Sequence, residues 1–137
     1  MTPPPMPAVT ALYAALVALL LLVFALRVSS FRWSLGVGIG DGGHDTLARA
    51  IRVHANAVEW AVPVLFLLLV AELNRASPLL LHACGIALVV ARVLHGFGLS
   101  RRSGLSPGRF AGIAITWTVL IVLALWDLWA FVRTLAV

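Results

Sequence analysis

The chain has 137 residues, 62% of them hydrophobic, and a mean hydropathy of +1.06. Soluble domains are about 45 to 50% apolar, so this composition excludes an ordinary soluble fold and predicts an integral membrane protein embedded in the bilayer. The formal net charge is +5, and all ten basic residues are arginine. Because these arginines flank apolar segments instead of forming a patch on a soluble surface, we expect no nucleic-acid partner.

Four apolar segments predict transmembrane helices, at about residues 8–26, 46–73, 78–99 and 107–132. The first segment carries no charge, and its 19 residues are about as many as a helix needs to cross the hydrocarbon core. No basic residue precedes it, which favours a retained span over a cleaved signal peptide. The length of the chain allows one compact unit, so we expect a single domain over residues 1–137.

Local signals mark the ends of these segments. Asp45 is expected to cap the second helix, and Pro63 to kink it. Ser77 and Ser106 are each followed by a proline, which is typical of a cap and the first turn of a helix. Residues 31–45 contain five glycines and no helical periodicity, so they predict a loop. The predicted fold class is therefore all-α, an integral membrane four-helix bundle.

The arginines are distributed unequally between the two sides of this bundle. Only Arg75 and Arg133 belong to the side that carries the termini. The first and third loops are flanked by Arg27, Arg32, Arg49, Arg52, Arg101, Arg102 and Arg109. By the positive-inside rule, these two loops face the cytoplasm, and both termini lie outside it.

Polar residues within the spans form two stripes. Arg52, Asn56 and Glu59 are spaced i, i+4 and i+7, so they share one face of the second helix. On the third helix, Arg92 and His95 are three residues apart and also share a face. At about 1.5 Å per residue, Glu59 and Arg92 both lie roughly 10 Å below the same membrane surface. We therefore expect an ion pair between Glu59 and Arg92.

Such an ion pair has two possible roles. It is either a structural contact that joins two helices and balances its own charges, or part of a binding site. The surplus of cations favours the second reading, because one glutamate does not balance five guanidinium groups near one membrane face. These groups belong to Arg27, Arg49, Arg52, Arg92 and Arg109. They predict an anionic ligand, with anionic lipid headgroups as the alternative. We expect no metal site, since His54 and His95 lack a third ligand at a suitable spacing.

The string RVHANAVEWAVP, residues 52–63, resembles the signature helix of the MAPEG family, the membrane-associated proteins in eicosanoid and glutathione metabolism. Its pattern is Arg-x-His-x-Asn-x-x-Glu, followed by a proline four residues on. ARVLH, residues 91–95, is similar to the third-helix motif of that family, and Pro107-x-Arg109 to the start of its fourth helix. The four spans match in order, so the resemblance covers nearly the whole chain.

The resemblance implies a homotrimer of four-helix subunits, with glutathione held between neighbouring subunits near the cytoplasmic surface. It implies that Glu59 receives the ammonium group of glutathione and that arginines receive its carboxylates. Arg109 matches the catalytic arginine that stabilises the glutathione thiolate, and a fixed cation beside a thiol does favour the anion. The implied glutathione-binding residues are Arg27, Arg52, Asn56, Glu59, Arg92 and His95.

The chain departs from the family at the tyrosines that commonly surround glutathione. Trp60, His95 and Leu99 occupy the equivalent places, and the single tyrosine of the chain is Tyr13, in the first span. We therefore do not expect a phenol to activate the thiol. The chain is more similar to the compact bacterial members of the family, which implies a bacterial inner membrane.

Three functions follow from these observations. The first is a glutathione-dependent transferase or peroxidase acting on hydrophobic electrophiles, with the lipophilic substrate entering sideways from the bilayer. The second is a non-catalytic lipid-binding or partner-presenting membrane protein, which the missing tyrosines favour. The third is a proton-coupled exporter that uses Glu59 as its carboxylate. The neighbouring arginines disfavour the exporter because they hold Glu59 ionised.

Overall fold

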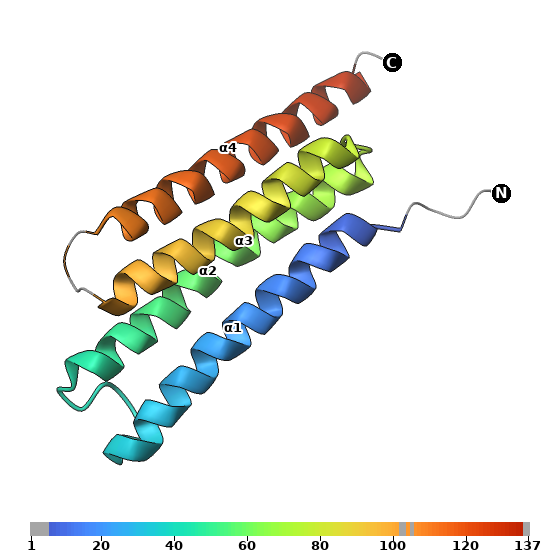
Figure 1. Cartoon of the computed structure of the whole chain (residues 1–137). Helices are drawn as coiled ribbons and strands as arrows, with labels where there is room; N and C mark the ends of the chain where they lie inside the picture. Colours follow the sequence, from blue (N-terminus) through green and yellow to red (C-terminus); the bar gives the residue numbers. More distant parts are fainter. Residues whose placement is uncertain (1–5, 102–103, 105, 136–137) are drawn as a thin grey trace.

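The computed structural model describes residues 6–101, 104 and 106–135, and within them every regular element is an α-helix. Arg102 lies outside the described residues. The helices are α1 (Ala8–Leu35), α2 (Asp45–Leu73), α3 (Pro78–Arg101) and α4 (Pro107–Leu135) (Figure 1). Each contains one of the four expected spans, and each is long and apolar enough to cross a membrane. The expected all-helical fold is confirmed.

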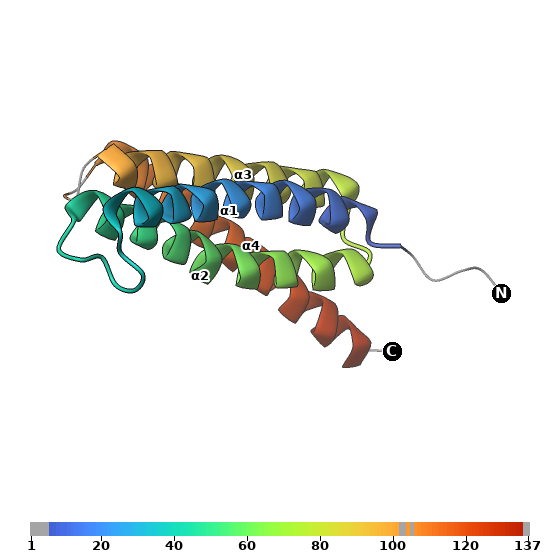
Figure 2. The same ribbon diagram turned by 90° about the horizontal axis from the view of Figure 1, so that it is seen from below.

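The four helices lie side by side and alternate in direction (Figure 1). Helices α2 and α3 pack against each other and form the middle of the bundle, and both contact α1 and α4. Within the described residues, α1 and α4 do not contact each other. The α1–α2 loop lies at one end of the bundle, hereafter the loop end, together with the last turn of α3 and the first turn of α4. Figure 2 shows that the C-terminal half of α4 diverges from the other helices.

Helix α1 is longer than the sequence indicated. Residues 31–35 were expected to be loop, but they are helical, and the loop begins only at Gly36. Gly36 has a φ of 68°, and the N–H of Val37 donates to the carbonyl oxygen of Arg32 at 3.1 Å. This is the Schellman arrangement that ends many helices. The end of the apolar run therefore marks the end of the span, and the left-handed glycine marks the end of the helix.

The starts of the other helices follow local signals with one exception. The Oγ of Ser77 accepts from the N–H of Leu80, and the Oγ of Ser106 accepts from the N–H of Arg109, so both predicted caps are confirmed. Asp45 was predicted as a cap and is instead the first helical residue of α2, because His44 before it takes the extended capping conformation. The carboxylate of Asp45 still lies in the first turn, where it complements the helix dipole.

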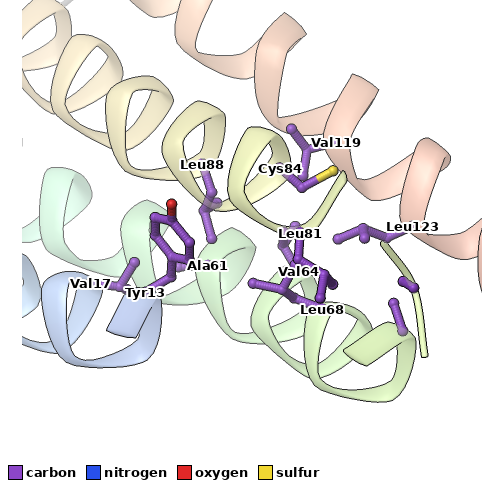
Figure 3. Packing of buried hydrophobic residues seen from close by; sticks show 12 residues of the cluster. Tyr13, Val17, Ala61, Val64, Leu68, Leu81, Cys84, Leu88, Val119 and Leu123 are labelled. Carbon is purple, nitrogen blue, oxygen red and sulfur yellow. The ribbon is translucent and has the colours of Figure 1, made fainter. Parts of the chain in front are cut away.

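The apolar core occupies the half of the bundle farther from the loop end. It consists of aliphatic residues, one aromatic residue and one cysteine, which Figure 3 shows in contact across all four helices. Its labelled members are Tyr13, Val17, Ala61, Val64, Leu68, Leu81, Cys84, Leu88, Val119 and Leu123. Of the four buried polar side chains in the described residues, Arg92, His95 and Thr116 lie nearer the loop end, and Thr10 lies at the opposite end. Buried polar groups are therefore concentrated in the half of the bundle nearer the loop end, hereafter the polar half, and the other half is called the apolar half.

Helices α1 and α3 meet closely at one point of this core. The ring of Tyr13 lies flat against Gly85, where an added Cβ would be 2.2 Å from the ring atom Cδ2. The hydroxyl of Tyr13 and Nδ1 of His82 are 2.9 Å apart and share a hydrogen bond, which fixes the ring in this position. Only glycine fits under the ring without displacing it.

This contact reverses the usual effect of replacing glycine by alanine in a helix. Gly85→Ala should destabilise the protein by up to about 2 kcal/mol, because an overpacking cost of about 1 to 3 kcal/mol outweighs the gain of about 1 kcal/mol in helix propensity. Thermal unfolding in detergent measures the change. Gly38→Ala is the matched control, since a Cβ there meets nothing within 4 Å. An unchanged or raised melting temperature for Gly85→Ala would contradict the close contact.

Candidate functional site

A groove of about 390 Å³ opens near the loop end between α2, α3 and α4. We call it the arginine groove because three arginines line it, together with a single acidic residue, an aspartate. Its lining residues are Asp45, Ala48, Arg49, Arg52, Asn56, His95, Leu99, Arg109 and Ile113. The α2 residues recur at spacings of three and four, as one helical face requires. The lining residues of α3 are four apart, and so are those of α4.

Arg92 lies directly behind this groove and is almost completely buried, with 1% of its surface exposed. Its Nη1 donates to Oδ1 of Asn56 at 3.2 Å, and its Nη2 donates to the carbonyl oxygen of Gly112 at 3.1 Å and to Oγ1 of Thr116. One side chain therefore connects α2, α3 and α4. All three acceptors are neutral, so the positive charge of Arg92 has no acidic partner among the described residues.

The contact with Arg92 also determines how Asn56 is oriented. A guanidinium group only donates hydrogen bonds, so the amide oxygen of Asn56 must face Arg92. The amide nitrogen is then the donor that Asn56 offers to other groups. Arg92 does not line the arginine groove itself. It acts on the groove by holding Asn56 and by placing a buried cation behind it.

The expected ion pair between Glu59 and Arg92 is wrong. Oε1 of Glu59 instead lies 3.6 Å from Nη1 of Arg52, on the same helix. Both of these side chains are more than half exposed, whereas Arg92 is buried. Asn56, one turn before Glu59 on the same stripe, is the residue that contacts Arg92 of α3.

Glycines allow α4 to approach α3 closely beside the arginine groove. A Cβ on Gly112 would lie 2.6 Å from the carbonyl oxygen of Ala91 and 2.7 Å from Cβ of His95. This close approach brings the carbonyl oxygen of Gly112 within reach of Arg92. It also sets Nδ1 of His95 3.3 Å from the carbonyl oxygen of Arg109. Because a carbonyl oxygen only accepts, Nδ1 carries the proton in this bond.

Arg109 lies in the first turn of α4, at the mouth of the arginine groove. Its Nη1 donates to the carbonyl oxygen of Gly104 at 2.6 Å, and its backbone N–H is capped by Ser106. The side chain is therefore held toward the loop end. This places a fixed guanidinium group beside those of Arg49 and Arg52.

The structure brings together four of the residues that the sequence selected. Arg52, Asn56, His95 and Arg109 line the arginine groove. Arg92 supports the groove from behind, and Glu59 reaches it only through Arg52. Arg27 lies elsewhere, since its Nη1 donates to Oγ of Ser100 and it lines a second groove between α1 and α3.

Asp45 and Arg49 also line the groove. Arg49 was counted among the cations that predict an anionic ligand but was not assigned to glutathione, and Asp45 was not selected as a binding residue. The signal that identifies them is their spacing of seven residues from Arg52 and Asn56, which continues the same stripe toward the start of α2. Tyr13 bonds to His82, which lies 13 residues before His95 on α3, or about 20 Å along the helix. The single tyrosine therefore does not reach the groove.

These features define a multi-pass membrane protein with four helices and an arginine-lined groove at one end of the bundle. The model of the MAPEG family matches residues 10–129, and the chain belongs to this family. The inner membrane protein YecN of Escherichia coli (strain K12) is 41% identical over 121 residues, which are 88% of this chain and 91% of that protein. YecN of Escherichia coli O6:H1 matches equally well. The family resemblance carried by residues 52–63 is confirmed.

The buried contacts of Arg92 can be tested through one of its acceptors. Thr116→Val removes a hydroxyl that accepts from Arg92 and leaves the buried guanidinium with one acceptor fewer. We expect a loss of about 1 to 3 kcal/mol in stability, as for other buried polar groups deprived of a partner.

Thr118→Val is the matched control on the same helix. Its hydroxyl is exposed and donates only to the carbonyl oxygen of Ala114, within α4. Chemical or thermal unfolding of both variants in the same detergent gives the comparison. Equal effects of the two substitutions would show that Thr116 contributes nothing through Arg92.

Proposed function

We propose that the chain is a membrane-bound glutathione-dependent transferase or peroxidase that acts on hydrophobic electrophiles. The observation that carries the proposal is the arginine groove, in which three guanidinium groups face one carboxylate. Glutathione has two carboxylates and one ammonium group, and its reactive form adds a thiolate. The groove offers a surplus of cations for the anionic groups and a carboxylate, Asp45, at its edge.

Arginine suits this role better than lysine. Its planar group donates two parallel hydrogen bonds to a carboxylate and stays protonated in a partly desolvated site. Arg49 and Arg52 lie within one turn of each other on α2, so both can contact one end of the tripeptide. Asn56 contributes the amide donor that its contact with Arg92 leaves. Arg92 adds a positive potential, and within the described residues no carboxylate lies at ion-pair distance from it.

Arg109 is the catalytic residue in this proposal. Its guanidinium group stabilises the thiolate over the thiol, which raises the concentration of the nucleophile at neutral pH. Glutathione supplies the sulfur, which forms a bond to an electrophilic carbon as the leaving group departs with its electron pair. With a hydroperoxide, two glutathione molecules are oxidised to the disulfide, and the peroxide is reduced to an alcohol and water. In conjugation the thiol proton passes to solvent at the loop end, whereas in peroxide reduction the two thiol protons end in the alcohol and the water.

We further propose that the functional unit is a homotrimer with the groove closed by a neighbouring copy. The ion pair of Arg52 and Glu59 supports this assembly. Both side chains are more than half exposed, yet they lie on a helix of membrane-spanning length, and Glu59 is at its middle. Charged groups that face lipid within a membrane are costly. A neighbouring subunit removes the cost by covering them.

The family resemblance implies a place for Arg27 at the glutathione site, but within one chain this residue faces the other groove. The proposed glutathione-binding set therefore does not include Arg27. Glu59, at the exposed edge of α2, takes the ammonium group in the trimer. His95 forms part of the groove wall, at the place that a tyrosine occupies in other family members.

The proposed orientation follows from the arginine distribution. The loop end carries most of the arginines and faces the cytoplasm by the positive-inside rule, with both termini on the other side. Glutathione then approaches from the cytoplasm, while a lipophilic substrate reaches the groove from the bilayer. The inner membrane is the proposed location, as it is for the Escherichia coli relative, an inner membrane protein.

Removal of the guanidinium group of Arg109 tests the catalytic proposal. Arg109→Ala should lower the rate of glutathione conjugation to chlorodinitrobenzene at least about a hundredfold, as expected for loss of a donor that stabilises a reacting anion. The oligomeric state should not change. Arg133→Ala, at the opposite end of α4, is the control and should retain the rate. Conjugation at the normal rate in Arg109→Ala would remove Arg109 from the mechanism.

The position of Tyr13 favours a second function, a non-catalytic lipid-binding or partner-presenting protein. The only tyrosine of the chain is hydrogen-bonded to His82, so no tyrosine stands at the places beside glutathione where family members commonly carry one. Thermal unfolding in detergent with millimolar glutathione separates the two functions. The enzyme should be stabilised by several degrees, and Arg52→Gln should abolish the shift. A response to lipids alone, with none to glutathione, would favour the second function.

A further inference from the structure

A second groove, of about 440 Å³, lies between α1 and α3 and is separate from the arginine groove. We call it the α1–α3 groove. Its walls are apolar over most of their length and basic at the loop end. The lining residues are Leu20, Val23, Phe24, Arg27, Val93, Gly96, Phe97, Ser100 and Arg101.

The two walls follow the same pattern. On α1 the lining residues are spaced i, i+3, i+4 and i+7, from Leu20 to Arg27. On α3 they begin with the same spacing at Val93 and end one residue later, at Arg101. Both helices run toward the loop end, so each wall begins apolar and ends in an arginine. The apolar stretch is about 10 Å long, measured along either helix.

Both arginines are held in place by neighbouring groups. Nη1 of Arg27 donates to Oγ of Ser100, whose own proton goes to the carbonyl oxygen of Gly96 at 2.6 Å. The guanidinium carbon of Arg101 lies 3.9 Å from the centre of the Phe97 ring, which is a cation–π distance. Two long side chains that are already ordered lose less entropy when they bind a common anion.

Among the described residues, no acidic residue lines the α1–α3 groove. Neither Arg27 nor Arg101 has a carboxylate at ion-pair distance in that part of the chain. Arg27 directly follows Leu26, the last residue of the expected first span, which places the pair at the expected boundary between hydrocarbon and headgroups. An anionic group at the membrane surface can supply the counter-charge that the groove lacks.

From this geometry we propose that the α1–α3 groove binds one anionic phospholipid. The phosphate sits between Arg27 and Arg101, and an acyl chain runs along Val23, Phe24 and Val93 toward the middle of the bilayer. Guanidinium groups recognise phosphate through paired, charge-assisted hydrogen bonds. Gly96 contributes by leaving room for the ring of Phe24, which a Cβ would approach to 2.6 Å. The lipid site does not depend on the proposed enzyme activity.

This assignment gives Arg27 a different partner from the glutathione that the family resemblance implies. The two roles make opposite predictions for Arg27→Gln. Loss of lipid binding with unchanged glutathione binding supports the lipid site. Loss of glutathione binding with unchanged lipid binding overturns it.

Native mass spectrometry of the purified protein tests the proposal directly. The protein in detergent is mixed with phosphatidylglycerol or with phosphatidylcholine of the same acyl chains, each at the same concentration. We expect phosphatidylglycerol to be retained preferentially. Arg27→Gln and Arg101→Gln should each weaken its binding about tenfold. Val93→Trp, at an exposed position, should fill the apolar stretch and weaken the binding of either lipid.

Two control variants separate a defined site from general attraction. Arg133→Gln removes an arginine that also stacks on an aromatic ring, Trp129 at 4.8 Å, but at the other end of the bundle. Arg32→Gln removes an arginine at the loop end that lies outside the α1–α3 groove. Both should bind phosphatidylglycerol as the unmodified protein does. An equal loss in Arg32→Gln would replace the site with diffuse electrostatic attraction.

Two further outcomes decide the nature of the occupant. Inorganic phosphate at the concentration of the lipid should leave the lipid bound, since it has no acyl chain to fill the apolar stretch. Displacement by phosphate would show a site for a free anion and overturn the lipid assignment. A change of oligomeric state in Val93→Trp, with lipid retention unchanged, would identify a second copy of the chain as the occupant instead.

Discussion

The polar half of the bundle depends on the burial of one guanidinium group. Arg92 is fixed by three neutral acceptors on two other helices, and no acid within the described residues balances its charge. Taking a cation out of water costs several kcal/mol, and hydrogen bonds to neutral groups offset only part of this cost. The folded state therefore accepts a local electrostatic cost at this point. It gains a fixed helix geometry and a positive potential next to an open groove.

The division of the bundle into two halves explains how that cost is tolerated. The apolar half, with Leu68, Leu88 and Leu123 fully buried, holds the helices together by close packing. In a membrane such packing matters more than in water, because lipid tails solvate apolar surfaces nearly as well as protein does. The glycines of α3 and α4 serve both halves, since they let the helices approach and let backbone carbonyls take part in the polar contacts.

Much of the fold could be predicted from the sequence, because hydropathy and helix caps are local signals. The four spans, the caps at Ser77 and Ser106 and the all-helical class required only neighbouring residues. The end of α1 could not be predicted from hydropathy, since the helix continues through polar residues until Gly36 takes a left-handed conformation. Asp45 was misplaced by one position for a similar reason, as two adjacent residues competed for the cap.

The sequence indicated which residues share a helix face at the candidate site, but not which of them contact the neighbouring helix. Helical spacing placed Arg52, Asn56 and Glu59 on one stripe, yet spacing alone does not tell which edge of the stripe faces α3. The structure shows that Asn56 is the residue of the stripe that contacts α3, through Arg92. It also shows that Arg27 lies in a different groove of the same chain. Membership of the family was evident from one twelve-residue string, because that string combines charge, amide and proline at fixed intervals.

The contact between Tyr13 and Gly85 restricts how the sequence can evolve at these two positions. The ring of Tyr13 fills the space that a side chain at position 85 would need, so the sizes of the two residues cannot change independently. A larger residue at position 85 becomes acceptable only after the ring at position 13 has been replaced by a smaller side chain. Related chains should therefore carry either this pair or an inverted one, and intermediates that hold two large residues should be rare.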